Sequence, residues 1–444
     1  MSPIEFAYAE GGITAPAGFM AAGVSAGLKR SGRRDVALIA AGEACPTAAV
    51  FTTNRMAAPP VVLSRMHVAS GLTRAIVVNA GCANACTGAR GFEDARAMAL
   101  AAADALGCMP EEVLVASTGV IGQPVPMELV LPGIAEAAEA LDVNAGSDAA
   151  EAIMTTDTFL KEAAVTFLLD GVRCTVGGMA KGSGMIQPNM ATMLAFVTTD
   201  APLDSVACDA ALRAAAARTF NRITVDSDTS TNDMCSLMAS GAAGGDPITT
   251  DDVRFPAVAA AVEHVCGELA RMVVRDGEGA TKLIAVTVTG AASEADAEAA
   301  AFAIANSPLV KTAVFGADAN WGRVAMAIGK SDAAVDPDRV RITFAGVLAC
   351  DGGTAVVFDE GAAAQALARD EVTIEVDLGL GATEATVWTC DLTYEYVRIN
   401  GEYRSCETRS FRRSWARRPR SPRRCHGSSG RGAARSSSSM AARR

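Results

Sequence analysis

The stretch that most constrains this chain runs from Lys181 to Thr199 and reads KGSGMIQPNMATMLAFVTT. Its first part contains two glycines and a proline, which favour a flexible loop. From Met193 onward the residues favour strands, and the apolar run predicts a buried strand. Thr192 therefore stands where a loop enters a core strand.

Cutting the peptide bond before Thr192 would leave a threonine at a new N-terminus on a rigid element. Such a residue carries a hydroxyl nucleophile and an α-amine of pKa about 7.7–8.0 that can accept its proton. From the residues alone, two interpretations stay open. The stretch is either a self-cleaving N-terminal nucleophile or an ordinary glycine-rich loop before a strand.

Three further segments place polar groups beside glycines or at the ends of predicted elements. Thr118 and Gly119 follow a predicted strand and could supply a hydroxyl and a backbone N–H to an oxyanion, although Ser-Thr-Gly is also a common turn. Thr155 begins a Thr-Thr-Asp-Thr cluster that would equally serve as a helix cap. Glu278 lies in a glycine-rich segment, where a lone glutamate is ordinarily exposed.

The pattern Lys-Gly-x-Gly-Met-x-x-Pro-x-x-Ala-Thr-Met-Leu closely resembles the cleavage segment of the ornithine acetyltransferase family, the bifunctional glutamate N-acetyltransferases of arginine biosynthesis. Segments 50–55, 225–233 and 391–405 resemble other parts of that family, in the same order. The resemblance implies an α/β fold, a layered α-β-β-α sandwich with a smaller C-terminal α/β domain.

By this resemblance, residues 1–282 form the catalytic sandwich domain and residues 283–405 the C-terminal domain. Cleavage between Ala191 and Thr192 would give an alpha chain, 1–191, and a beta chain from 192. Two of each chain would assemble into a heterotetramer. Residues 406–444 are rich in Arg and Ser, and this composition predicts a disordered tail.

The activity that the resemblance implies is transfer of acetyl from N2-acetyl-L-ornithine to L-glutamate through an acetyl-Thr192 enzyme, in a ping-pong cycle. Thr118 and Gly119 would form the oxyanion hole, and Ala191 would precede the cleaved bond. The implied substrate-binding residues are Thr155, Lys181, Thr192, Glu278, Asn400 and Ser405. No cofactor and no metal is expected, and acetyl-CoA as a second acetyl donor is left open.

Net charge argues against nucleic acid and membranes as partners. The 444 residues carry a formal charge of −11. The tail after Ser405 holds twelve Arg and one Glu, or +11, so the rest carries −22. An acidic body has no general attraction for anionic polymers or lipids. The twelve cysteines include no Cys-x-x-Cys pair, and the N-terminus resembles no signal peptide, so we expect free thiols and a cytoplasmic enzyme.

Other chemistries have weaker support in the sequence. There are three histidines and no Gly-x-Ser-x-Gly elbow with a recognisable His and Asp, so a Ser-His-Asp hydrolase is not indicated. Neither the acidic run 226–233 nor the segment 322–331 matches a calcium loop or a nucleotide-binding loop. The alternatives are an N-terminal-nucleophile aminopeptidase or amidase of related fold, and a non-catalytic binding protein with a blocked Thr192.

Hydrophobic periodicity gives the elements around these segments. The predicted helices span 93–106, 134–141, 205–217, 255–274 and 294–305, with one short helix near the end. The predicted strands span 36–40, 48–53, 75–79, 113–115, 165–169, 174–176, 193–199, 283–289, 340–344, 354–358, 371–377 and 382–388.

Overall fold

The computed structural model describes residues 4–187 and 193–402 and divides into a unit ending at Val397 and a second beginning at Arg398. The first nine strands are β1 (Ala7–Tyr8), β2 (Phe19–Val24), β3 (Val36–Phe51), β4 (Leu72–Cys82), β5 (Val113–Val120), β6 (Lys161–Leu169), β7 (Val172–Lys181), β8 (Leu194–Thr199) and β9 (Met234–Ala239). The helices among them are α1 (Pro59–His67), α2 (Gly88–Leu106), α3 (Met127–Glu139), α4 (Gly146–Ile153), α5 (Ser205–Arg218) and α6 (Phe255–Arg275).

Among the described residues, these nine strands form one hydrogen-bonded system in the order β1-β6-β7-β8-β9-β3-β4-β5, with β2 also paired to β3. The 16-residue strand β3 joins its two halves. Its first part pairs with β2 and β4, its last part pairs with β9, and the register is irregular between Ala40 and Cys45. The two strands predicted at 36–40 and 48–53 are therefore one strand that passes from one half-sheet to the other.

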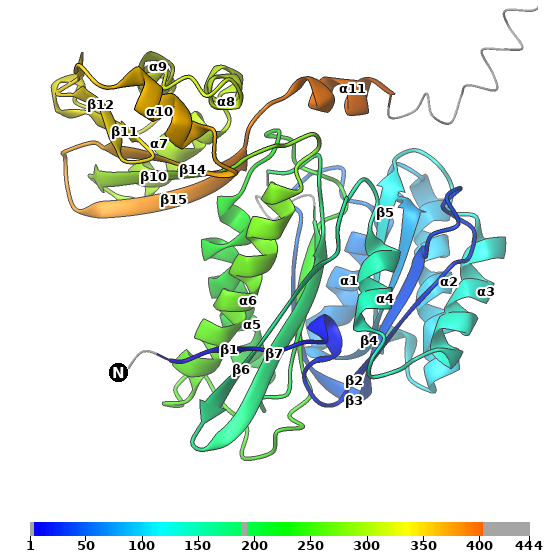
Figure 1. Cartoon of the computed structure of the whole chain (residues 1–444). Coiled ribbons are helices and arrows are strands. Elements are labelled where there is room, and N and C mark those ends of the chain that lie inside the picture. Colours follow the sequence, from blue (N-terminus) through cyan, green and yellow to red (C-terminus); the bar gives the residue numbers. More distant parts are fainter. Residues whose placement is uncertain (1–3, 188–192, 403–444) are drawn as a thin grey trace, which may run out of the picture. The chain divides into compact units, whose positions relative to one another are not determined.

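The two half-sheets face each other across an apolar interior and are covered by helices on their outer faces (Figure 1). Helices α5 and α6 pack on the half that contains β7, β8 and β9. Helices α1, α2 and α3 pack on the half that contains β4 and β5, and α4 contacts strands of both halves. The predicted α-β-β-α sandwich is confirmed.

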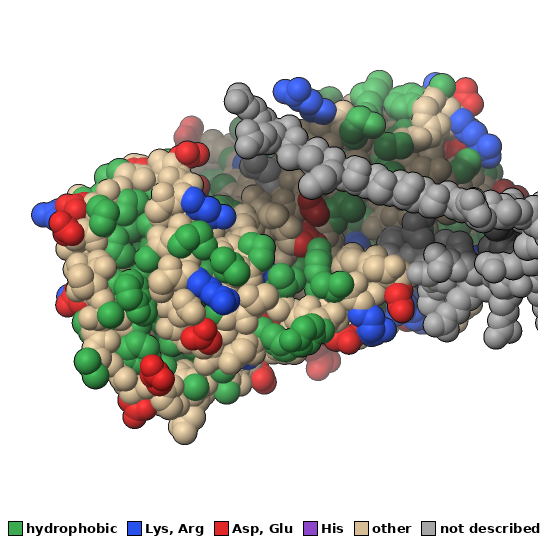
Figure 2. Space-filling model, turned by 90° about the horizontal axis from the view of Figure 1, so that it is seen from above, with side chains coloured by type: hydrophobic (Ala, Val, Ile, Leu, Met, Phe, Trp, Pro, Cys, Tyr) green, Lys and Arg blue, Asp and Glu red, His purple; other side chains and the backbone are tan. Residues whose placement is uncertain are grey.

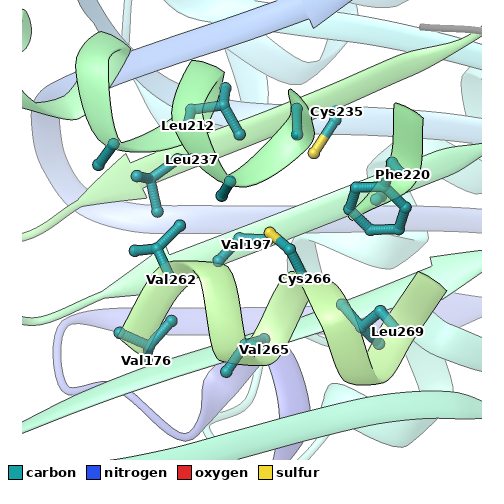
Figure 3. Close-up of a cluster of buried hydrophobic side chains, with 14 of the residues drawn as sticks. Val176, Val197, Leu212, Phe220, Cys235, Leu237, Val262, Val265, Cys266 and Leu269 are labelled. Atoms are coloured by element: carbon teal, nitrogen blue, oxygen red, sulfur yellow. The ribbon is translucent and has the colours of Figure 1, made fainter. Parts of the chain in front are cut away.

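Strand β8 lies deep in this sandwich, and all six of its residues are buried. Leu194 and Phe196 face the interior between the half-sheets, whereas Ala195 and Val197 face the helices α5 and α6. Figure 3 shows Val197 among side chains of α5, α6 and β9. Burial on both faces explains why this strand reads as a continuous apolar run and was predictable from the sequence.

Strand β7 continues through Gly177 and Gly178, beyond the strand predicted at 174–176. Gly177 and Gly178 are paired within the strand, and Lys181 is its last residue. A Cβ on Gly177 would clash with the backbone oxygen of Gly12, and one on Gly178 would lie 3.0 Å from Leu269 Cδ1. These glycines serve close packing within a strand.

A second, six-stranded sheet follows among the described residues, in the order β13-β12-β11-β14-β10-β15. Its strands are β10 (Leu283–Ala291), β11 (Arg341–Phe344), β12 (Val347–Asp351), β13 (Thr354–Ala355), β14 (Glu371–Asp377) and β15 (Thr383–Cys390). The accompanying helices are α7 (Glu294–Ala305), α8 (Pro308–Phe315), α9 (Trp321–Gly329) and α10 (Glu360–Leu367), and α11 (Tyr394–Glu402) follows them.

The five helices predicted by range are confirmed, and α7 has the predicted bounds. The strand prediction at 354–358 is wrong beyond Ala355, because β13 pairs with β12 over only two residues and leaves Val357 exposed. The domain boundary at 282 and the tail from 406 stay predictions, and the tail lies outside the described residues.

Backbone and polar contacts connect the segment that precedes β9 to the second sheet and its helices α7 and α8. Thr224 Oγ1 donates to Asn306 Oδ1 at 2.7 Å, and Lys311 Nζ donates to the carbonyl oxygen of Val225 at 2.8 Å. Ile223 also forms a parallel bridge with Trp388. The loop 223–233 is therefore fixed from the side of the second sheet.

In the part of the chain that the structure describes, no helix is both long and apolar enough to cross a lipid bilayer. On the face seen in Figure 2, acidic, basic and apolar side chains are interspersed.

Candidate active site

The ends of three neighbouring strands meet where the described chain resumes at Met193. Strand β7 runs antiparallel to β8, so Lys181 at its end pairs with Leu194 at the start of β8. Strand β9 runs parallel to β8, and Leu194 pairs with Met234 on that side. The topology thus places Lys181, the start of β8 and Asp233 side by side, at the same end of these three strands.

Lys181 is buried at this end, with 7% of its surface exposed. Its Nζ donates a hydrogen bond to Thr118 Oγ1 at 3.3 Å. Burial lowers the pKa of Lys181 below its ordinary value, and the charge of Lys161 lowers it further. The carboxylates of Asp157, Asp233 and Glu278 act in the opposite direction. Lys181 is therefore a buried cation that faces both the predicted oxyanion donor and several acidic groups.

Thr118 and Gly119 lie at the end of β5, within the strand rather than in a turn beyond it. Gly119 has a φ of 127° and pairs with Gly81, where the β4–β5 register becomes irregular. A Cβ on Gly119 would lie 2.5 Å from the Gly81 carbonyl oxygen and 2.7 Å from Cys82 N. Two backbones approach so closely here that the position requires glycine.

Thr155 lies in the loop between α4 and β6, and its backbone N–H donates to Asp157 Oδ2 at 2.8 Å. The other carboxylate oxygen of Asp157 accepts the N–H of Gly182 at 2.7 Å. One buried carboxylate thus joins the Thr155 loop to the residue that follows Lys181.

Glu278 is 8% exposed, contrary to the ordinary expectation for a glutamate among glycines. Its backbone N–H donates to the Ser183 carbonyl oxygen at 2.9 Å. Its carboxylate lies against Gly184, where a Cβ would come within 2.5 Å of Glu278 Cδ. The glycine after Ser183 makes room for this carboxylate, a relation that no sequence pattern discloses.

Four of the described candidates therefore converge: Thr118 and Lys181 by direct contact, Gly119 beside Thr118, and Glu278 against the loop that follows Lys181. Thr155 joins them through Asp157. Asn400 is exposed on α11 and belongs to the second unit. The remaining candidates, Ala191, Thr192 and Ser405, lie outside the described residues. The roles of all these residues stay predictions.

Sequence reasoning did not single out four buried ionisable groups: Asp157, Lys161, Asp233 and Asp276. Asp233 is 3% exposed, and burial raises its pKa far above the ordinary value, although the Met193 backbone N–H donates to its carboxyl group. Its Oδ2 has no hydrogen-bond partner among residues 4–187 and 193–402. Asp157 and Asp276 lie in polar segments of the sequence, which could have indicated them as candidate site residues. Lys161 lies at the start of an ordinary strand and carries no such signal.

The ArgJ family model matches residues 20–405. The arginine biosynthesis bifunctional protein ArgJ of Symbiobacterium thermophilum is 54% identical over 397 residues, which cover 89% of this chain and 99% of that protein.

Solved structures also match. An ornithine acetyltransferase of Mycobacterium tuberculosis, crystallised with ornithine, is 41% identical, covers 42% of this chain and 99% of its own, and has a TM-score of 0.39. An L-aminopeptidase D-Ala-esterase/amidase of Ochrobactrum anthropi is 14% identical, covers 62% of this chain and 89% of its own, and has a TM-score of 0.39.

Proposed function

The chain belongs to the ArgJ family, so it is an acetyltransferase of arginine biosynthesis, and from this premise we propose a mechanism built on its own residues. The acetyl group moves from N2-acetyl-L-ornithine to Thr192 and from there to L-glutamate. The aminopeptidase alternative has only a distant likeness of 14% identity to support it.

In the first half of the proposed cycle, the Thr192 hydroxyl attacks the acetyl carbonyl carbon, and the free α-amine of the same residue takes the hydroxyl proton. The tetrahedral intermediate carries a negative oxygen, which accepts hydrogen bonds from the Thr118 hydroxyl and the Gly119 backbone N–H. When it collapses, the carbon–nitrogen bond breaks, the proton moves to the leaving amine, and ornithine departs.

In the second half, the amine of glutamate attacks the acetyl ester of Thr192. The same two donors stabilise the second intermediate, and the threonine hydroxyl is regenerated with the proton that the glutamate amine gives up. The products are N-acetylglutamate and the free enzyme, so atoms and protons balance over the cycle.

The hydrogen bond from Lys181 Nζ to Thr118 Oγ1 carries this proposal. A buried ammonium that donates to this oxygen leaves the Thr118 O–H free to point elsewhere and makes it a better donor, since a charged partner polarises the hydroxyl. The same ammonium can pair with the α-carboxylate of an amino acid. Glu278 nearby can pair with a substrate ammonium.

The remaining parts of the proposal concern maturation and assembly. Thr192 would first attack the Ala191 carbonyl and release itself as an N-terminal residue, giving chains 1–191 and 192 onward. Two copies of each would assemble in the cytoplasm. Acetyl-CoA is proposed as an additional donor of the acetyl group to Thr192.

Thr192→Ala and Thr192→Ser test the nucleophile. We expect the alanine variant to remain one uncut chain and to transfer no acetyl group, because it lacks the attacking oxygen. The serine variant keeps that oxygen and should be cut and active at a reduced rate. Intact-mass spectrometry with N-terminal sequencing checks scission, and ornithine release checks transfer. An uncut wild-type chain with full transfer activity would contradict the proposal.

A further inference from the structure

Lys161 is a lysine held entirely inside the protein, with 1% of its surface exposed. Its Nζ lies 2.7 Å from Asp157 Oδ1 and 2.5 Å from Asp276 Oδ2, and the side chains of both carboxylates are almost fully buried. We call these three residues the buried triad. Its single cation is shared by two carboxylates that come from different parts of the chain.

Each carboxylate of the buried triad also holds backbone. Asp157 accepts the N–H groups of Thr155 and Gly182, at 2.8 and 2.7 Å. Asp276 accepts the N–H of Thr158 at 2.9 Å and also its hydroxyl.

The backbone of Asp276 also contacts the segment that follows Lys181. The carbonyl oxygen of Asp276 accepts the Ser183 hydroxyl at 2.6 Å, and the Ser183 carbonyl oxygen accepts the Glu278 N–H at 2.9 Å. One ammonium thus fixes three separate segments, 155–158, 181–183 and 276–278. These are the segments that carry Thr155, Lys181 and Glu278.

Stability alone is a poor reason for such an arrangement. A buried ion pair gains little over apolar side chains of the same volume, because desolvation cancels much of the attraction. Removing one partner, by contrast, leaves an uncompensated charge. The gain lies in geometry, since charge-assisted hydrogen bonds fix the backbone of each segment more narrowly than apolar contacts do.

We propose that Lys161 is a positioning residue of the acetyl transfer, which holds Thr155, Lys181 and Glu278 in the arrangement that binds the amino acid, without touching it. This inference rests on the proposed function for the identity of the bound amino acids. It assigns the buried triad to the amino acid pocket and not to the nucleophile, and the triad reaches the oxyanion donor Thr118 only through the hydrogen bond from Lys181.

The electrostatics of Lys181 support this role. Four groups act on it from neighbouring segments: Asp157 from the Thr155 loop, Lys161 from β6, Asp233 from the start of β9, and Glu278 from the loop after α6. The pKa of Asp157 is held well below its usual range, because the charges of Lys181 and Lys161 outweigh the effect of burial. Removing the charge of Lys161 should therefore raise the pKa of Lys181.

The test uses Lys161→Met in the full chain and compares two acyl donors. One is N2-acetylornithine with glutamate as acceptor, which needs the amino acid pocket. The other is p-nitrophenyl acetate, an activated ester that needs only the nucleophile and the oxyanion donors. We expect KM for both amino acids to rise about 10- to 100-fold, while ester turnover falls by less than about tenfold, because a displaced Lys181 also weakens its hydrogen bond to Thr118.

A pH profile adds a result that loss of structure would not give. Substrate binding weakens on the alkaline side as Lys181 loses its proton. Because Lys161→Met removes a neighbouring positive charge, the alkaline limb of kcat/KM should move to higher pH. A purely structural defect would lower the whole profile without this shift.

Two further variants keep the test decisive if Lys161→Met folds poorly. The double variant Lys161→Met with Asp276→Asn restores the net charge of the buried triad, and it should recover stability but not KM. The matched control is Lys311→Met, which removes another lysine that is 4% exposed and donates to Val225 O and Thr389 Oγ1. This control should lose stability while KM stays near wild type.

An unchanged KM in Lys161→Met, or ester turnover that falls in step with amino acid transfer, would overturn the positioning role. Failure of the proposed function looks different. In that case the wild-type enzyme itself transfers no acetyl from acetylornithine to glutamate, whatever the variants do.

Discussion

Gly119 has a backbone conformation that side chains rarely adopt, and its space is filled by the neighbouring strand. We expect Gly119→Ala to lower the free energy of unfolding by at least about 3 kcal/mol, since strain and a backbone clash add together. Gly122→Ala is the matched control. Gly122 also has a positive φ, of 83°, but a Cβ there would meet open space.

For Gly122→Ala the cost should be about 1 kcal/mol, which reflects strain alone. Urea unfolding of both variants measures the two values. Equal costs would show that the close approach of β4 and β5 at Gly119 is absent in solution.

Asp233 should make stability depend on pH in an unusual direction. Burial raises its pKa, so the folded protein keeps this proton where the unfolded chain has lost it. The contribution of Asp233 to the free energy of unfolding is fully present below about pH 4, and it is lost as pH rises through the raised pKa. Asn cannot lose a proton, so Asp233→Asn lacks this loss.

The Tm of Asp233→Asn minus that of wild type should therefore grow between about pH 4 and pH 8. Asp104→Asn, at an exposed position on α2, serves as the control and should show no such trend. A Tm difference for Asp233→Asn that is flat with pH would contradict the buried, protonated carboxyl group.

Individual residues were predictable only where a motif named them. The resemblance pointed to Thr118, Lys181 and Glu278, and the first two are in contact. Lys161 carries no sequence signal, because its partner Asp276 is 115 residues away and only the fold unites them. A sequence pattern can indicate contacts between residues that are close in the chain. In the buried triad only the pair Asp157–Lys161 is of this kind.

At the scale of elements, helices α5 and α6 cover one half-sheet with an almost wholly apolar interface (Figure 3). Leu269 on α6 is fully buried there. Leu269→Ala should lower the free energy of unfolding by about 2–5 kcal/mol, from lost burial and the cavity left behind. Chemical denaturation measures this.

Leu100→Ala is the matched control on another helix, because Leu100 on α2 is 50% exposed. Its cost should stay below about 0.5 kcal/mol. A small effect at Leu269 would mean that α6 does not cover the sheet as described.

Helices and strands were predictable where their apolar residues recur with one clear period, or where both faces are buried. Helix α7 and strand β14 have the predicted bounds, and β8 differs by one residue from the predicted strand. Strand β7 was not fully predictable, because its glycines respond to Gly12 and Leu269, which are distant in sequence. Likewise, no local signal shows that β3 crosses between two half-sheets.

At the scale of the whole molecule, Asn306 connects the second sheet to the loop before the undescribed segment. It accepts from Thr224 Oγ1 at 2.7 Å and donates to Gln187 Oε1 at 2.8 Å. Asn306→Leu removes both bonds, although Thr224 Oγ1 keeps a partner in the carbonyl oxygen of Ile186 at 3.2 Å, so we expect a loss of about 1–3 kcal/mol.

Thr312→Val is the control, because Thr312 bonds only locally to carbonyl oxygens of its own helix start and to Arg323, and its side chain is exposed. Differential scanning calorimetry compares the variants. If Asn306→Leu melts at the wild-type temperature, the connection between the two parts contributes nothing to stability.

The layered architecture was predictable through family resemblance and not through periodicity. Periodicity gives the elements but not their neighbours, and β9 pairs with β3, from which it lies far away in the chain. The second sheet was predictable as strand-rich, whereas its parallel pair β10–β14 was not, since the 79 residues 292–370 separate the two strands.

The strand order has a consequence for any cut made at the start of β8. Strands β8 and β9 would then belong to the downstream fragment, yet they are flanked by β7 and β3 of the upstream fragment. Strands of the two fragments would alternate within one sheet, and the fragments could separate only if the backbone hydrogen bonds of β8 with β7 and of β9 with β3 were broken. The severed molecule would stay together as one body, and once taken apart it would need two partners to find each other again.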